Sequence, residues 1–294
     1  MASLKEVRTR IMSVKSTQQI TSAMKMVAAS KLRKAQTGIL QLRPFAQKQK
    51  EMLQELSAGT DGFESGGFTT VRNGNKLLLV VLSSNRGLCG AFNSNVIKQV
   101  NAIAAPYGKP GKSSDLAMIT IGRKATEYFQ RQNFNILSSH DNLYDDLTFS
   151  NTSAIAEKLM ELFLEGKFDK IQFVYHQFKN AVTQKLITEQ FLPIEPPAEL
   201  KGNAARIPDY VFDPSKEEIL VHLVPGILKT QVYKAVLDSW ASELGARMTA
   251  MSQATDNASE LLKELKLTYN NARQAAITKE ILEIVGGAEA LKNS

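Results

Sequence analysis

The residues best placed for chemistry form a glycine-containing segment that follows an apolar run. Ser83-Ser84-Asn85-Arg86-Gly87-Leu88-Cys89-Gly90 comes after Leu77–Leu82 and before a predicted helix, where many α/β proteins bind ligands. Its backbone amides could hold a phosphate group, but the fingerprint G-x-G-x-x-G is absent, so a plain glycine-rich turn is favoured. Cys89 lies near Arg86, which could lower the pKa of the thiol, although a small residue in a turn is the commoner case.

A second segment resembles the end of a nucleotide-binding P-loop. Gly111-Lys112-Ser113 would need its first glycine at the position of Pro106, and it precedes a predicted strand instead of following one. The spacing therefore predicts no nucleotide site here.

Residues that could hold a metal or transfer a proton are scattered. The three histidines have no second ligand at metal spacing, and the pair Asp145-Asp146 has no evident acid or base partner; the histidines are His140, His176 and His222. The sequence predicts no catalytic residue, no metal site and no cofactor.

Composition indicates a folded chain. Of the 294 residues 43% are hydrophobic and 22% are charged, as in ordinary folded proteins. No run of eighteen apolar residues occurs, so no membrane-spanning helix is predicted. The N-terminus lacks the apolar core of a signal peptide, and its regular heptads favour mature structure over a transit peptide. The single cysteine excludes an internal disulfide and fits a reducing cytoplasm.

The positive charge belongs to one segment. Residues 1–60 hold eleven basic groups against three acidic ones, a net +8 in a chain whose total is +7. Such a segment expects an acidic partner, and nucleic acid, an anionic membrane and an acidic protein surface all fit. Phe45 is the only aromatic residue among these sixty, which disfavours stacking on nucleic-acid bases.

The two ends of the chain carry heptad patterns. No proline follows Pro225, and apolar or small residues recur there in steps of three and four, which is typical of a coiled coil; they include Tyr233, Leu237, Trp240, Leu244, Met251, Ala254, Ala258, Leu261, Leu265, Ala272, Ala275 and Leu282. Residues 3–56 show a similar seam, polar at Gln18, Thr21 and Lys25, and polar seam positions fix register. The ends are predicted to pair with each other, antiparallel. Pro44 could either kink the first helix or be absorbed in it.

Between these ends, apolar strands alternate with amphipathic helices. Strands are predicted at Leu77–Leu82, Leu116–Ile121, Ile136–Ser138, Ile171–Tyr175 and Lys185–Gln190, with the last two as a hairpin. Helices are predicted at Asn93–Ala105, Lys124–Arg131 and Ser150–Leu164, the last capped by Ser150 or Asn151.

The predicted fold class is therefore α/β, with an antiparallel coiled coil of long N- and C-terminal helices and an inserted Rossmann-like α/β domain. The expected domains are residues 1–58 (N-terminal helix), 59–75 (linker), 76–208 (α/β domain) and 209–294 (C-terminal helix).

Several long segments resemble one family. The match covers the whole chain in the same order as the gamma subunits of rotary F-type ATP synthases, and it rests on residues 17–31, 85–90, 246–251, 254–258, 269–278 and 280–287. The resemblance implies a coiled-coil shaft inside a ring of alpha and beta subunits. It also implies an α/β foot that binds the epsilon subunit and the c-subunit ring. The catalytic nucleotide sites of that family belong to alpha and beta, so no active site or cofactor is expected here.

The resemblance also implies roles for particular residues. Arg273 and Gln274 match positions that form a catch with an acidic loop of beta, and Arg247 and Met24 match positions that meet the acidic lever loop of beta. Lys25 is assigned to the same contact. Tyr210 matches an epsilon-contacting position. Ordinary helix surface is the alternative for each, and simple core packing is a rival for Met24.

The expected location is peripheral, on the cytoplasmic face of a bacterial inner membrane. Two other hypotheses stay open on the sequence: a basic coiled-coil adaptor for nucleic acid or anionic membranes, and an α/β enzyme with a dimerising coiled coil. The first draws on the +8 segment, and the second lacks a catalytic constellation.

Overall fold

The computed structural model of the protein describes residues 4–57, 67–72, 74–108, 115–194 and 216–292. The chain divides into two compact units, Ala28–Arg247 and Met1–Val27 with Met248–Ser294, which are taken in turn. The long helices α1 (Leu4–Ser57) and α5 (Lys216–Lys292) contribute to both units. The predicted linker and the segment Gly111-Lys112-Ser113 lie largely or wholly outside the described residues.

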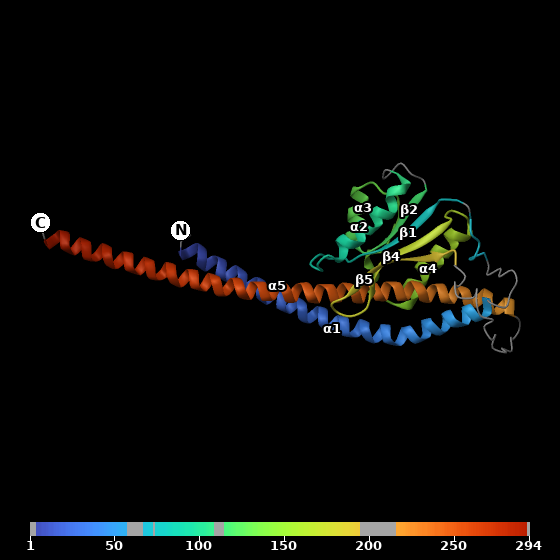
Figure 1. The fold of residues 1–294 in the computed structure, drawn as a ribbon, viewed down its shortest axis with the longest axis horizontal. Coiled ribbons are helices and arrows are strands. Elements are labelled where there is room, and N and C mark those ends of the chain that lie inside the picture. Colours follow the sequence, from blue (N-terminus) through green and yellow to red (C-terminus); the bar gives the residue numbers. More distant parts are fainter. Residues whose placement is uncertain (1–3, 58–66, 73, 109–114, 195–215, 293–294) are drawn as a thin grey trace, which may run out of the picture. The chain divides into compact units, whose positions relative to one another are not determined.

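The centre of the unit Ala28–Arg247 is a five-stranded mixed sheet in the order β3-β2-β1-β4-β5 (Figure 1). The first four strands in this order run parallel, and β5 pairs antiparallel with β4. All five predicted strands are confirmed, with β4 and β5 longer than expected; their bounds are β1 Leu77–Leu82, β2 Leu116–Ile121, β3 Ile136–Ser139, β4 Lys170–Phe178 and β5 Gln184–Leu192.

Helices cover both faces of the sheet. They are α2 (Phe92–Ala104), α3 (Arg123–Arg131) and α4 (Phe149–Leu164), with short 3₁₀ turns at Ala105–Tyr107 and Asp141–Tyr144. The predicted cap of α4 is wrong: the side chain of Thr148, and not of Ser150 or Asn151, accepts from the backbone N–H of Asn151. Thr148 is extended, as an N-cap residue must be, whereas Ser150 and Asn151 already lie inside the helix.

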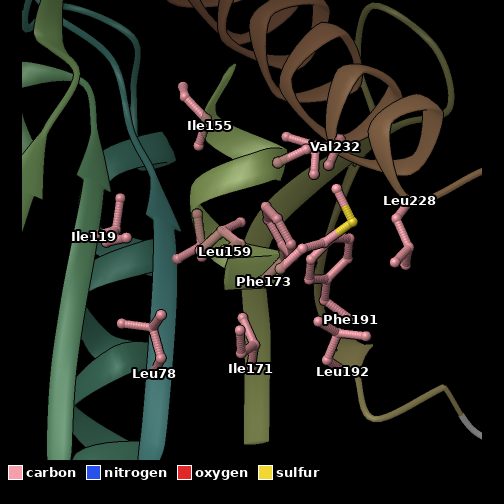
Figure 2. Close-up of a cluster of buried hydrophobic side chains, with 14 of the residues drawn as sticks. Leu78, Ile119, Ile155, Leu159, Ile171, Phe173, Phe191, Leu192, Leu228 and Val232 are labelled. Carbon is pink, nitrogen blue, oxygen red and sulfur yellow. The ribbon is translucent and has the colours of Figure 1, made fainter. Parts of the chain in front are cut away.

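The strands β1, β2 and β4 contribute side chains to two hydrophobic cores because successive side chains alternate between the faces of the sheet. Alternate residues of β1, such as Leu78, pack with α4 and α5 around Phe173 and Leu159 (Figure 2). The intervening residues, such as Leu79, pack with α2 and α3. Every residue of β1 and β2 is buried, as expected for strands covered on both sides.

Within this unit, α5 departs from the predicted narrow seam. Every residue from Ala235 to Gly245 except Trp240 is buried, including the polar Asp238, Ser239, Ser242 and Glu243. The helix packs on the sheet core through Leu228 and Val232, and it also approaches α1, where a Cβ on Gly38 would contact Leu237 at 3.5 Å. Pro44 and Pro225 are both accommodated inside their helices.

In the unit Met1–Val27 with Met248–Ser294, α1 and α5 pair antiparallel through a seam that includes Val7, Met251, Ala258, Leu262 and Leu265. The polar seam positions are satisfied across the pair. Gln18 Nε2 donates to Ser259 Oγ at 2.7 Å, the Thr21 and Thr255 hydroxyls lie 2.8 Å apart, and Lys25 Nζ donates to Ser252 Oγ at 2.9 Å. This polar ladder fixes the register, as predicted.

The turn between β2 and α3 yields a testable prediction. Gly122 has φ +103°, and an added Cβ would lie 2.2 Å from the carbonyl oxygen of Ser83. Because both backbone strain and collision oppose a side chain, Gly122→Ala should lower the free energy of unfolding by about 3 kcal/mol, measured by urea denaturation. Gly87→Ala is the matched control, since a Cβ there meets nothing within 4 Å. Equal losses in both variants would contradict this account of the turn.

Candidate functional site

The carboxyl ends of β1 and β4 form the point where the strand order reverses, since β2 lies on one side of β1 and β4 on the other. In open α/β sheets ligands bind in the crevice at such a point. Here α5 covers it. Ser242 Oγ donates to the carbonyl of His176 in β4 at 2.9 Å, and Arg247 reaches the loop that follows β1.

Arg247 is held by backbone and carboxylate oxygens of its own chain. Nη1 donates to Gly87 O at 2.5 Å and Nη2 to Arg86 O at 3.2 Å. Nε and Nη2 also donate to Glu243 Oε1, one helical turn earlier, at 3.1 and 2.5 Å. The two side chains are only 11% and 12% exposed, so this is a largely buried ion pair. The structure thus directs the Arg247 guanidinium inward.

The loop after β1 is fixed from within as well. Asn85 Nδ2 donates to Asp141 O at 2.7 Å, Asn85 Oδ1 accepts from the N–H of Arg123, and Asn93 Oδ1 accepts from the N–H of Ser84. Leu88 adopts a left-handed conformation with φ +63°. The loop presents carbonyl oxygens to the Arg247 guanidinium. A plain glycine-rich turn is therefore favoured over a phosphate-binding site.

Of the two interpretations of Cys89, the less favoured one, a thiol with a lowered pKa, is wrong. Cys89 is 1% exposed, and burial raises the pKa of its thiol, which outweighs the lowering by the Ser84 hydrogen bond and the Arg247 charge. Desolvation disfavours the thiolate more than one nearby cation favours it.

The turn of the β4–β5 hairpin provides a further contact with the long helices. Arg43 Nη2 of α1 donates to Phe178 O at 2.8 Å and lies 3.8 Å from Asp238 Oδ1 of α5. A Cβ on Gly245 would lie 3.0 Å from Ala181 O, so the glycine permits close approach of α5 to the turn.

Two buried titratable groups lie beside these contacts. Desolvation raises the pKa of Asp238 to about 6 despite Lys234 and Arg43, which lower it, and neither carboxylate oxygen has a hydrogen-bond partner among the described residues. Desolvation lowers the pKa of His176 to about 4. The His176 ring stacks on Phe92 at 4.4 Å.

All of the other predicted site residues except Tyr210 lie in the unit with the paired helix ends. Met24 is half-buried, while Lys25, Arg273 and Gln274 are exposed. Lys25 bonds across to Ser252 as described above. Tyr210 lies outside the described residues.

The C-terminal part of α5 differs from the prediction. The seam was expected to continue through Ala275 and Leu282, but both are exposed. Since Gln18 pairs with Ser259 and the helices run antiparallel, Leu4, where the described part of α1 begins, lies opposite the neighbourhood of Arg273. Beyond that point large apolar side chains are exposed: Ile277, Ile281, Leu282, Ile284 and Val285.

In the part of the chain that the structure describes, no cluster of three His, Cys, Asp or Glu side chains has an arrangement that could hold a metal ion. Among the same residues, no helix combines the length and apolarity needed to cross a membrane.

Comparison with known proteins assigns the chain. Residues 3–291 match the family described as ATP synthase. The ATP synthase gamma chain of Flavobacterium johnsoniae is 56% identical over 292 residues, covering 99% of both chains, and that of Chlorobaculum parvum is 43% identical over 293 residues, covering 99% of this chain and all of the relative. The chain belongs to the ATP synthase gamma chain family.

Solved structures agree with the gamma chain fold. A chain of the central stalk and c-ring of the Tetrahymena thermophila mitochondrial ATP synthase is 26% identical, with a TM-score of 0.58, covering 80% of this chain and 99% of that one. A chain from the Euglena gracilis mitochondrial ATP synthase, at 21% identity, has a TM-score of 0.68 over 98% of this chain and 94% of that one, and it supports the fold alone.

Sequence reasoning missed the buried polar residues of α5. No role is predicted for Asp238 or Glu243 from the sequence. One signal was available, because Glu243 and Arg247 are spaced i, i+4 on a helix, which permits an ion pair. Their burial depends on the sheet packing beside them and has no local signature.

The two buried titratable groups predict opposing pH dependences. Asp238 has a higher pKa folded than unfolded, so its burial costs stability as pH rises from about 4 to 6. His176 has a lower pKa folded than unfolded, so its contribution is lost as pH falls from about 6.5 to 4. Asp238→Asn should raise the free energy of unfolding at pH 7 by about 2 kcal/mol. In this variant the free energy of unfolding should fall as the pH drops below 6, because the opposing effect of Asp238 no longer offsets the protonation of His176.

Urea denaturation between pH 4 and 8 measures both effects. The control is His176→Gln in the Asp238→Asn background, in which the free energy of unfolding should depend little on pH. A wild-type profile that matches that of Asp238→Asn at every pH would contradict the assignment of Asp238.

Proposed function

We propose that this chain is the central-stalk subunit of a rotary ATP synthase, with no active site of its own. The observation that carries the proposal is the match along 99% of both chains with proteins named ATP synthase gamma chain, at 56% identity. The paired antiparallel helix ends and the sheet whose ligand crevice is filled by α5 support it. The comparisons give no support to the nucleic-acid or membrane adaptor.

In this role the paired helices α1 and α5 turn inside a ring of alternating alpha and beta subunits, and the α/β unit takes its drive from a membrane ring of c subunits. The epsilon subunit is the further partner proposed for the α/β unit, with Tyr210 as a contact. Each beta subunit is pushed in turn through its open and closed states, which couples ion flow to ATP synthesis. The complex is peripheral to the membrane, and we place this chain on the cytoplasmic face of a bacterial inner membrane.

The proposed contact surface for beta consists of Met24, Lys25, Arg273 and Gln274. The last three are exposed and therefore able to bind a partner. A rotating shaft needs contacts that break and re-form. Cations and amides that meet acidic loops provide charge-assisted hydrogen bonds of this kind, whereas deep interlocking of side chains would hold the shaft in place. The +8 charge of residues 1–60 suits acidic surfaces on the surrounding ring.

Assembly tests the proposal directly. Native mass spectrometry of this chain mixed with its alpha and beta subunits should show one copy per three alpha and three beta, and magnesium-ATP turnover should appear only when the chain is added. A chain that stays free and leaves turnover unchanged would overturn the proposal, and salt-sensitive binding to DNA or anionic vesicles would then favour the adaptor.

The contact surface gives a separate prediction. Arg273→Ala and Gln274→Ala should each lower magnesium-ATP turnover of the assembled complex about tenfold, because one charge-assisted contact is worth roughly 1.5–3 kcal/mol. Lys279→Ala is the matched control: Lys279 is exposed on the same helix and pairs with Glu283 of its own chain. Loss of assembly in the Arg273 or Gln274 variants would show that these positions are structural instead.

A further inference from the structure

We propose that Arg247 is a positioning residue that joins α5 to the sheet at the carboxyl end of β1, so that helix and sheet turn as one body. The inference rests on the proposed rotary function, and it assigns Arg247 a role inside the chain in place of a contact with beta. On this inference, the crevice at the point where the strand order reverses is the place where α5 is attached to the sheet, and it binds no ligand.

The geometry of the guanidinium supports an internal role. Four of its five N–H groups are engaged: one with Gly87 O, one with Arg86 O and two with Glu243. Its side chain is 11% exposed in a chain that carries no partner, so little of it is available to another subunit. Glu243 holds the plane of the guanidinium and offsets its charge, which leaves the fork aimed at the two carbonyls.

The chemistry of the contact suits a joint that bears load. Apolar packing between α5 and the sheet is non-directional, so it resists separation more than it resists sliding. Hydrogen bonds depend steeply on direction and distance. The bond from Ser242 to His176 is buried, whereas the bonds from Arg247 end on carbonyls of the exposed residues Arg86 and Gly87. Ser242 attaches α5 to β4, and Arg247 attaches it to the loop that follows the neighbouring strand β1, so that a turning force on the sheet reaches the helix at two points.

A second contact acts from α1. Arg43 donates a hydrogen bond to Phe178 O at the end of β4. Phe178 lies two residues after His176, whose carbonyl accepts the hydrogen bond from Ser242. The bonds from Arg43 and Ser242 end on backbone carbonyls of β4, and Arg247 bonds to backbone carbonyls of the loop after β1. The side chains of these acceptor residues can therefore vary while the bonds are kept.

Lysine distinguishes the joint from a contact based on charge alone. Arg247→Lys keeps the positive charge but lacks the planar fork that reaches Gly87, Arg86 and Glu243 together. In the isolated full-length chain, hydrogen exchange of the amides of residues 84–90 should become at least tenfold faster in Arg247→Lys. Arg131→Lys, at an exposed position of α3, is the matched control and should leave this exchange unchanged. Unchanged exchange in Arg247→Lys would overturn the proposal.

Coupling in the complete membrane complex provides the functional readout. The number of ions pumped per ATP hydrolysed should fall at least twofold with Arg247→Lys and stay at the wild-type value with Arg131→Lys. A ratio that stays at the wild-type value in Arg247→Lys would overturn the joint. If turnover and pumping also fall together at that unchanged ratio, the result points to a beta contact instead.

A covalent replacement of the joint supplies the rescue. Gly87→Cys with Arg247→Cys, in a Cys89→Ser background, places one thiol on each side of the joint. Without a cross-linker this variant should pump fewer ions per ATP hydrolysed than wild type, and cross-linking the two thiols with a short bismaleimide should restore the wild-type ratio. Gly87 has open space for a side chain. Failure of the cross-linked chain to regain coupling would count against the joint. If wild type does not assemble with alpha and beta, the proposed function itself fails, whereas a wild-type complex with no Arg247→Lys effect overturns only this inference.

Discussion

The structure of the unit Ala28–Arg247 depends on the contact between α5 and the carboxyl edge of the sheet. The part of α5 that belongs to this unit packs on the core of the sheet, and its Ser242 and Arg247 bond to β4 and to the loop after β1. The edge that other doubly wound proteins leave open for a ligand is therefore occupied by protein. A sheet whose natural binding place is filled by its own chain suits a subunit whose work is mechanical.

The surroundings of α5 change along its length, and the side chains change with them. Between Ala235 and Gly245 the helix is buried almost all round, and of its buried polar residues Ser242 and Glu243 are hydrogen-bonded while the Asp238 carboxylate is not. Further along, only a seam facing α1 is covered, and hydroxyl and amide pairs such as Thr21 with Thr255 set the register. Beyond Arg273 the described part of α1 ends, and apolar groups remain uncovered. One secondary structure thus serves three kinds of packing.

Periodicity was enough to predict the elements. Burial of Val7, Leu32 and Ile39 follows from steps of three and four, and continuous apolar runs gave the parallel strands. The cap of α4 was misplaced because Thr148, Ser150 and Asn151 are all good caps, and only the backbone conformation selects one. The raised thiol pKa of Cys89 and the inward direction of Arg247 depend on which distant segments come together, which residue types alone do not encode. Family resemblance supplied the proposed roles of Arg273 and Gln274, which lie on open helix surface.

The uncovered apolar side chains near the end of α5, from Ile277 to Val285, bear on how the chain is produced. Groups of this kind are tolerated in water only while a partner is at hand, and otherwise they promote self-association. Under the proposed function, a cell that makes this chain in excess of the ring proposed to receive it would accumulate an aggregation-prone product. Five side chains at one end of a helix would then require that the chain and its proposed ring be made in balance.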